Sequence, residues 1–307
     1  MPPNTTPRVS AYSAAHFALE LHGMSKLGMF RSIEGGGLKA DVMTYQNGGT
    51  YDRWRQLGKP KFEDIKLQVG MAMSEPFYGW IAEFFKGNPV RKNGAIVAAD
   101  FYYKERARRE FTDAMITELV FPKLDANDKN TAYMNVSMSV EDIVYKKGDG
   151  STPLQQNQGV DEQKNWKACN FKFSIDNLPG CDRVTKVDSF TIKHTALEYH
   201  QGGRRSASKT PSAIDWPQIS FYVPEPDAHD MIAHFSKRGI KGEVPGLNRL
   251  HGTIDTFDNK MESHFTLQFF NGDIVNVSTD KSDSATEEMK LVKFDLYCER
   301  MEFAYKG

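Results

Sequence analysis

Apolar and polar residues alternate along most of this chain with a period of two, which is typical of half-buried β-strands. Phe17, Leu19 and Leu21 set the pattern at the start of the chain. The alternation predicts strands in the first half at 16–22, 38–45, 65–69, 95–103, 111–121 and 134–140. We expect the polar and basic segment 50–61 to be an exposed loop, so that a long two-stranded hairpin carries an extended tip.

One segment has helical spacing instead. Its apolar positions, which recur every three or four residues, are Phe77, Trp80, Ile81, Phe84 and Phe85. Ser74 can cap this helix, Pro76 suits its first turn, and Gly87 can end it. A wide aromatic stripe is far more typical of packing against the open face of a sheet than of a cofactor box.

Three segments of the first half recur 154 residues later. The matched pairs are 45–49 with 199–203, 17–21 with 171–175, and 65–69 with 219–223. Further matches pair 80–84 with 231–235 at a shift of 151, and 111–119 with 269–277 and 136–140 with 294–298 at a shift of 158. We interpret the chain as two copies of one domain. Asp227 can cap the second helix, Gly239 can end it, and Ile232 and Phe235 belong to its packing face.

This repeat predicts four parts of the chain. They are a flexible N-terminal arm at 1–12, a first domain at 13–147, a linker at 148–165 and a second domain at 166–307. A length of 307 residues suits two domains of roughly 150 residues each.

Composition narrows the class of protein. The net charge of −1 argues against a protein that coats nucleic acid. Three cysteines, Cys169, Cys181 and Cys298, argue against a disulfide framework and favour a reducing compartment. No apolar run has the length of a signal peptide or of a membrane span, so we expect a protein made in the cytoplasm without membrane contact.

Candidate chemistry is weak throughout. Gly35-Gly36-Gly37 is not followed by Gly-Lys-Ser/Thr, and neither Gly-x-Ser-x-Gly nor His-Glu-x-x-His occurs. A spatial cluster of His194, His200 and His234 stays open, although scattered histidines are the commoner case. We therefore expect no catalytic, cofactor-binding or metal-binding residues, and no enzyme. The basic run 104–110 suits a nucleic-acid contact less well than a solvated face or ion pairs at a subunit edge, because acids interrupt it.

A resemblance adds to this reading. Phe17-x-Leu19-x-Leu21-x-Gly23, Tyr45-x-x-Gly48-Gly49, Ile65-x-Leu67-x-Val69-Gly70 and an aromatic helix with Trp80 together resemble the tail tube proteins of contractile-tailed phages. That family is similar to the tubes of contractile injection systems and to the haemolysin-coregulated tube proteins of type VI secretion. Members have one such domain where this chain has two, and the second copy carries His200-Gln201 before its glycines.

The resemblance implies a mainly β fold with two tail-tube-like sandwich or barrel domains, each covered by one helix. It implies sixfold rings around a lumen, in which the hairpin and its loop reach neighbouring subunits. The loop residues expected at this interface are Tyr45, Gly48, Gly49, Arg53, Arg55, Tyr199, Gly202, Gly203, Arg204 and Arg205. Implied partners are further copies of the chain, sheath, baseplate or spike proteins, and DNA or an effector that passes through without sequence-specific binding.

Two fused domains occupy two of six ring positions, so we expect three chains per ring in a phage tail or injection-system particle. Such a ring suits a repeating tube and equally a hub or initiator that joins a trimeric spike to the tube. A tandem β-sandwich binding module is the remaining alternative. It predicts aromatic or acidic loops at one end, whereas these loops are basic, small and polar.

Overall fold

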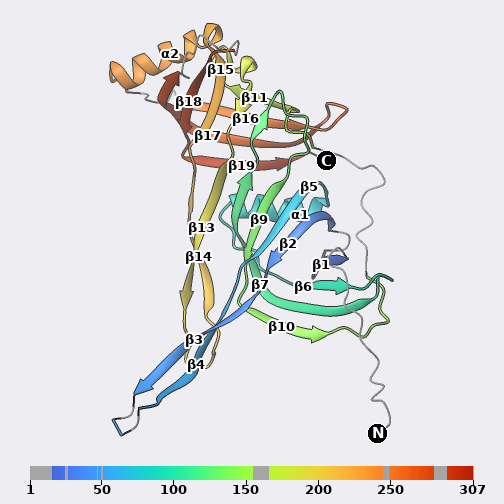
Figure 1. Cartoon of the computed structure of the whole chain (residues 1–307). Coiled ribbons are helices and arrows are strands. Elements are labelled where there is room, and N and C mark those ends of the chain that lie inside the picture. The colour runs from blue at the N-terminus through green and yellow to red at the C-terminus, as the bar shows by residue number, and fades with distance from the viewer. Residues whose placement is uncertain are drawn as a thin grey trace.

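The structure, a computed structural model, describes residues 16–24, 27–46, 48–49, 51–154, 166–244, 246, 249–279 and 289–306. Strands dominate, in two large sheets and one separate hairpin (Figure 1). The predicted mainly β fold class is therefore confirmed. The predicted arm at 1–12 and the later part of the predicted linker, 155–165, lie outside the described residues, and the domain boundaries stay a prediction.

The lower sheet in Figure 1 is built mainly from the first half of the chain, in the order β1-β6-β7-β9-β5-β2, with β10 on the other edge of β7. Its strands are β1 (Phe17–Leu21), β2 (Gly28–Gly35), β5 (Ile65–Met73), β6 (Lys92–Ala99), β7 (Glu105–Phe121), β9 (Met134–Ser139) and β10 (Asp142–Lys147). Period-two alternation is visible in β5, where Leu67 and Val69 are buried and Lys66 is exposed.

The upper sheet has the order β11-β16-β17-β18-β15-β12-β8, with β19 on β17. Its strands are β8 (Leu124–Asp125), β11 (Phe171–Ile175), β12 (Lys186–Val187), β15 (Ile219–Pro224), β16 (Leu250–Phe257), β17 (Ser263–Thr279), β18 (Leu291–Tyr297) and β19 (Arg300–Tyr305). The short β8 comes from the first half of the chain and pairs with β12, so the sheets exchange strands.

The two sheets share strand order and register. Gly94 lies opposite Phe111 in the lower sheet, and Gly252 lies opposite Phe269 in the upper one, 158 residues later. A Cβ atom would lie only 2.2 Å from a neighbouring carbonyl oxygen at Gly94 and 2.3 Å at Gly252, so each glycine lets a phenyl ring cross it. The register shift at 116/118 in β7 recurs at 274/276 in β17. This agreement supports the duplication, which remains our proposal.

Two long hairpins extend from the sheets. They are β3 (Leu38–Gln46) with β4 (Arg53–Phe62), and β13 (Phe190–Tyr199) with β14 (Ser208–Asp215). The expected loop at 50–61 is wrong, because most of it forms β4. The polar segment at 204–209, which corresponds to part of that loop in the second half, likewise ends in β14. Strand β4 is exposed along nearly its whole length, and its largely polar and basic sequence lacks the apolar alternation of a half-buried strand. Strand β14 begins with two buried residues, Ser208 and Lys209, but both are polar, so the pattern did not reveal it either.

The first helix, α1 (Glu75–Phe85), forms where predicted, with Pro76 in its first turn. Ser74 occupies the N-cap position but makes no side-chain capping hydrogen bond. The buried face of α1 comprises Phe77, Tyr78, Trp80, Ile81, Phe84 and Phe85.

The second helix, α2 (His229–Phe235), is shorter. It follows a 3-10 turn, η2 (Glu225–Asp227), and continues as a π-helical turn, η3 (Ser236–Ile240). Ala228 therefore holds the N-cap position expected for Asp227, and Gly239 lies inside the π turn. Phe235 is half-buried and Ile232 is 37% exposed.

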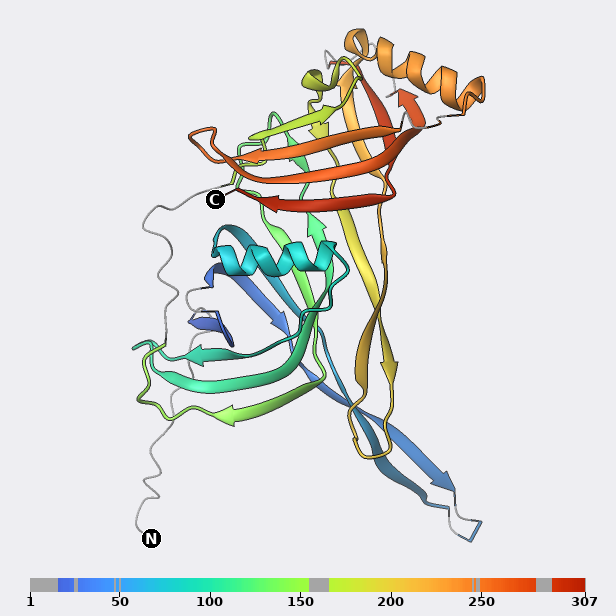
Figure 2. The same cartoon turned by 180° about the vertical axis from the view of Figure 1, so that it is seen from behind.

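One hydrophobic core runs through both halves of the chain. Helix α1 lies between the two sheets (Figure 2), where the Tyr78 ring stacks on Tyr305 with centroids 4.5 Å apart. A hydrogen bond of 3.0 Å joins the Tyr78 hydroxyl to His264 Nε2, and the Phe85 ring stacks on Phe303 at 5.8 Å. The helix thus packs the halves against each other rather than only closing its own sheet.

Candidate assembly interface

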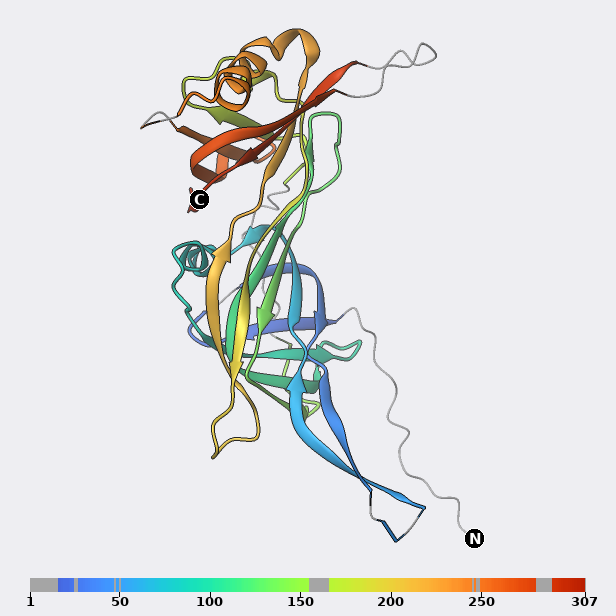
Figure 3. The same cartoon turned by 90° about the vertical axis from the view of Figure 1, so that its left-hand side faces the viewer.

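The second hairpin joins the two halves along a strand edge. Strand β13 leaves the upper sheet and runs down beside β7 of the lower one (Figure 3), pairing residues 190–193 with 121–118. Ile192 and Leu119 lie opposite each other and are both fully buried. The rings of Phe190 and Phe121 stack with centroids 5.1 Å apart. The hairpin of one half therefore completes the sheet of the other.

A buried ion pair holds the other strand of this hairpin. Glu141 Oε1 accepts the backbone N–H of Lys209 at 2.8 Å and an Arg91 N–H, while Arg91 also donates to the Lys209 carbonyl. The Lys209 Nζ donates to Ser139 Oγ at 2.7 Å. The Arg91–Glu141 pair thus binds both the backbone N–H and the backbone carbonyl of Lys209 on the outer edge of β14. We call this arrangement a backbone clamp.

Electrostatics keep the clamp charged. Burial acts to raise the pKa of Glu141, but the Lys209 N–H, Arg91 and the nearby Arg204 outweigh it and hold that pKa below its ordinary value. The carboxylate is therefore the stable form at neutral pH, and it gives the strong charge-assisted hydrogen bonds that the clamp needs.

The first hairpin has no such partner. Among the described residues, β3 and β4 pair only with each other, and Figures 1 and 2 show them projecting beyond the body of the molecule. Its exposed apolar side chains are Leu38, Val42, Met43, Tyr45, Trp54 and Leu57. Exposed apolar side chains clustered on a hairpin with unpaired edges are typical of an interaction surface.

The residues predicted for a subunit interface all lie on these two hairpins. In the first hairpin, Tyr45, Gly48, Gly49, Arg53 and Arg55 are all exposed. In the second, Tyr199, Gly202, Gly203, Arg204 and Arg205 are exposed at the turn.

Two of these residues contact parts of the chain outside their own hairpin. The Arg204 guanidinium lies 3.6 Å from the Glu141 carboxylate, and Arg205 donates to the Gly58 carbonyl at 3.3 Å. The second hairpin thus meets both the clamp and the first hairpin of its own chain. Whether the ten predicted residues contact another subunit stays a prediction.

The residues of the clamp are absent from those predicted from the sequence. Arg91 and Glu141 are 50 residues apart, so no local motif marks them. The available signal is the repeat itself, because a second Arg and Glu, Arg249 and Glu299, stand 158 residues further on.

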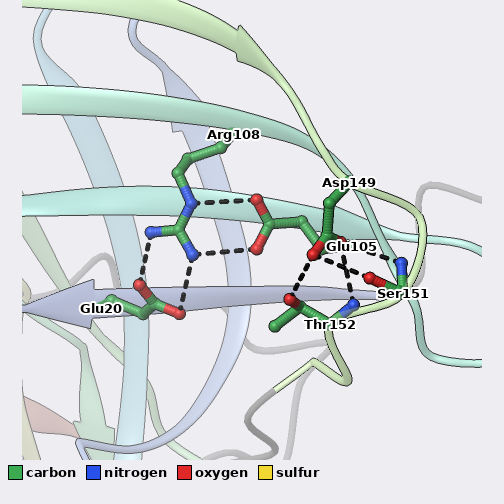
Figure 4. Close-up of polar contacts among 6 residues, drawn as sticks. All are labelled: Glu20, Glu105, Arg108, Asp149, Ser151 and Thr152. Atoms are coloured by element: carbon green, nitrogen blue, oxygen red, sulfur yellow. Dashed lines mark hydrogen bonds and ion pairs between the residues drawn. The ribbon is translucent and has the colours of Figure 1, made fainter.

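The basic run at the start of β7 pairs with acids of its own chain. Arg108 donates to Glu20 at 2.6 Å and to Glu105 at 3.0 Å, as Figure 4 shows. The hydrogen bonds to Glu105 and then Glu20 raise the pKa of Arg108 above its ordinary value. Arg106 lies 2.6 Å from Asp100. These pairings favour the ion-pair interpretation over a nucleic-acid contact.

The start of the predicted linker is held against β7. The Asp149 carboxylate accepts hydrogen bonds from the backbone N–H and hydroxyl groups of Ser151 and Thr152 at 2.6 to 2.9 Å (Figure 4). These bonds hold the pKa of Asp149 well below its usual range. The Thr152 carbonyl accepts from Glu105 N–H at 2.8 Å. Backbone hydrogen bonds and one isolated bridge, between Lys104 and Pro153, therefore hold residues 148–154 against the start of β7.

Other chemistry is sparse in the described part of the chain. There, no group of His, Cys, Asp and Glu is placed to hold a metal ion. His194 bonds to the Ile116 carbonyl at 2.8 Å, whereas His234 bonds to Asp273 at 2.9 Å. The cysteines Cys169, Cys181 and Cys298 form no disulfide bond with one another. None of the described helices combines the length and the apolar character that a membrane crossing requires.

Part of the chain is similar in sequence to a known protein family. Residues 13–144 match the family model described as T4-like virus tail tube protein gp19. No curated protein matches the chain in sequence. The resemblance to tail tube proteins is thus confirmed, and it identifies a structural role rather than an enzymatic one.

Solved structures of contractile injection systems are also similar to part of the chain. A chain of the extracellular contractile injection system PVC sheath–tube complex in the extended state has 16% identity and a TM-score of 0.40, covering 46% of this chain and 94% of that one. A chain of the anti-feeding prophage cap, described as the AFP tube terminating cap, has 18% identity and a TM-score of 0.39, covering 45% and 93%.

Proposed function

We propose that this chain is a structural ring component of a tail tube, in which three copies present six similar domains around a lumen. The two domains are those expected from the sequence, 13–147 and 166–307, joined by residues 148–165. The match of residues 13–144 to the tail tube family and the shared strand order of the two sheets support this proposal.

One observation carries the proposal. The junction between β13 and β7 forms inside the chain, whereas the two surfaces that correspond to it, the edge of β17 and the β3–β4 hairpin, make no such junction with each other. Residues 118–121 of β7 pair with β13. The corresponding residues of β17, 276–279, pair with β18 on one side and with no other described strand. At the other end, β3 and β4 form a hairpin without a sheet. A surface of this head-to-tail kind closes into a ring when its rotation allows.

The proposed role is mechanical. The joined sheets and hairpins would line a conduit for DNA or an effector protein, and the exposed loop residues from Tyr45 to Arg55 would reach neighbouring subunits. Sheath, baseplate or spike proteins are the expected partners, and the assembled product is a virion tail or an injection-system particle. No step of this role requires a cofactor or a catalytic residue.

Ring stoichiometry tests the proposal. The chain has a mass of 34.8 kDa, so native mass spectrometry of assembled rings should give three chains per layer. Negative-stain microscopy of the same sample should show rings with a uniform bore and six similar lobes. Six chains per ring layer, or monomers at every concentration, would rule the proposal out.

A second candidate shares this geometry: a hub or initiator ring between a trimeric spike and the tube. A ring of three two-domain chains favours this role, because its threefold symmetry matches a trimeric spike and its six similar domains match a sixfold tube. Counting copies per particle separates the two roles, since a tube needs many rings and a hub needs about one.

A further inference from the structure

The second half of the chain repeats the backbone clamp. Arg249 and Glu299 stand 158 residues after Arg91 and Glu141 and form the same ion pair. Asn271 Nδ2 donates to Glu299 Oε2 at 3.2 Å, which holds the carboxylate in place. The registers on either side also correspond, because the β17–β18 and β7–β9 pairs match at this shift. The second half thus carries a built clamp at the equivalent place.

The two clamps differ in what they hold. The Glu141 side chain is 6% exposed, because it grips the backbone of Lys209. The Glu299 side chain is 48% exposed and its guanidinium partner is 35% exposed. A charged pair that is covered by a strand in one half therefore faces solvent in the other.

The register of the hairpins identifies the missing occupant. In the second hairpin Lys209 lies opposite Glu198, and in the first hairpin Arg55 lies opposite Thr44, 154 residues earlier on both strands. Both hairpins also shift register at the same point, between 194 and 196 and between 40 and 42. Because alternate residues of a strand point their N–H and C=O groups outward, Arg55 presents the same two groups as Lys209.

Burial agrees with this correspondence. Ser208 and Lys209 are buried against the lower sheet, whereas their counterparts Trp54 and Arg55 are exposed. The first hairpin thus exposes the large apolar side chain of Trp54 next to Arg55, the residue that corresponds to the clamped Lys209.

The strand edges agree as well. Ile192 and Leu119 face each other in the finished junction. Their counterparts are Leu38, which is 51% exposed, and Val277, which is partly exposed. Both are apolar, so pairing them would bury a second contact of the same kind. The two free surfaces lie at opposite ends of the chain's sheets, so one chain's hairpin must meet another chain's sheet.

We propose that Arg249 and Glu299 clamp the backbone of Arg55 in a second copy of this chain. Glu299 accepts the Arg55 N–H, Arg249 donates to the Arg55 carbonyl, and β3 of that copy adds to the edge of β17 with Leu38 opposite Val277. The inference rests on the proposed ring and specifies the contact between its chains.

Dilution of assembled rings tests the clamp. Glu299→Gln keeps the size of the side chain but removes the charge that strengthens the hydrogen bond to Arg55. Mass photometry should show rings of this variant dissociating at a concentration about 10- to 100-fold higher than for the wild type. Glu302→Gln, at an exposed ion pair with Arg300 on β19, is the matched control and should dissociate like the wild type.

The outcomes separate the clamp from the ring. Wild-type rings with an unchanged dissociation concentration in Glu299→Gln would overturn the clamp and leave the ring standing. Wild-type monomers at every concentration would overturn the ring, and the clamp with it. Equal thermal unfolding of the wild-type and Glu299→Gln monomers should confirm that the variant is folded.

A covalent trap tests the register independently. With the three native cysteines replaced by alanine, Leu38→Cys and Val277→Cys place two thiols opposite each other across the proposed seam, within disulfide reach for paired strands. Oxidised rings should then run as covalent dimers and trimers on a non-reducing gel. The matched pair Leu57→Cys with Val277→Cys should not cross-link. Equal cross-linking of both pairs would overturn the proposed register.

Discussion

The same substitution at the two clamps should have very different effects on the stability of the monomer. Glu141→Gln leaves the buried end of Arg91 without its carboxylate and weakens the hydrogen bond from Lys209. Breaking a buried ion pair typically costs about 3 to 5 kcal/mol. Because Arg91 is 31% exposed and water can replace part of the interaction, we expect a loss of about 2 kcal/mol in the free energy of unfolding.

Glu299→Gln changes the same chemistry at an exposed place. Exposed ion pairs contribute about 0 to 1 kcal/mol, so the monomer should lose less than about 1 kcal/mol. Urea unfolding at a concentration below ring assembly measures both values. Native-state hydrogen exchange adds a local measurement, since the Lys209 amide should lose protection in Glu141→Gln and keep it in Glu299→Gln.

Equal destabilisation by the two substitutions would refute the reasoning. It would mean that Glu299 already holds a strand within its own chain, so that no vacant clamp exists. A Glu141→Gln monomer as stable as the wild type would be equally damaging, because the finished clamp would then contribute nothing to the junction from which the vacant one is inferred.

Three further predictions concern stability. The pKa of Glu141 is lower in the folded chain than unfolded, so its contribution is present above about pH 4.3 and is lost as the pH falls through the folded-state pKa; the urea midpoints of wild type and Glu141→Gln should converge there. Gly252→Ala should destabilise the chain by about 3 kcal/mol in urea unfolding, because its Cβ would meet a carbonyl oxygen at 2.3 Å. Gly79→Ala should instead stabilise it by up to about 1 kcal/mol, because a Cβ at this position of helix α1 meets no neighbouring atom within 4 Å. Phe121→Ala should cost about 3 kcal/mol by calorimetry, because it removes the stack with Phe190 between the halves.

The parts of the fold that face the core could be predicted from the sequence. Strand β5 and helix α1 were accessible because burial imposes a period on residues such as Leu67, Val69 and Trp80. Strand β4 was not, because its exposed sequence is largely polar and basic and so carries no apolar alternation. The short helix α2 was placed correctly, but its ends were not, because a π turn continues past the last regular residue.

The candidate site was only partly accessible. The hairpins could be expected from a resemblance and from their glycine pairs. The clamp could not, because Arg91 and Glu141 come together only after β6, β7 and β9 have paired. Its chemistry also depends on burial by Lys209, a residue of the other half. Sequence spacing gives no information about that contact until the register of both sheets is known.

The junction between β13 and β7 has a kinetic consequence. Because both sides belong to one chain, this seam forms within a single molecule at an effective concentration that does not depend on the amount of protein in the cell. The proposed ring then has three seams between molecules instead of six. If the halves are two copies of one domain, their order in the chain also fixes the direction in which one copy follows the other around the proposed ring.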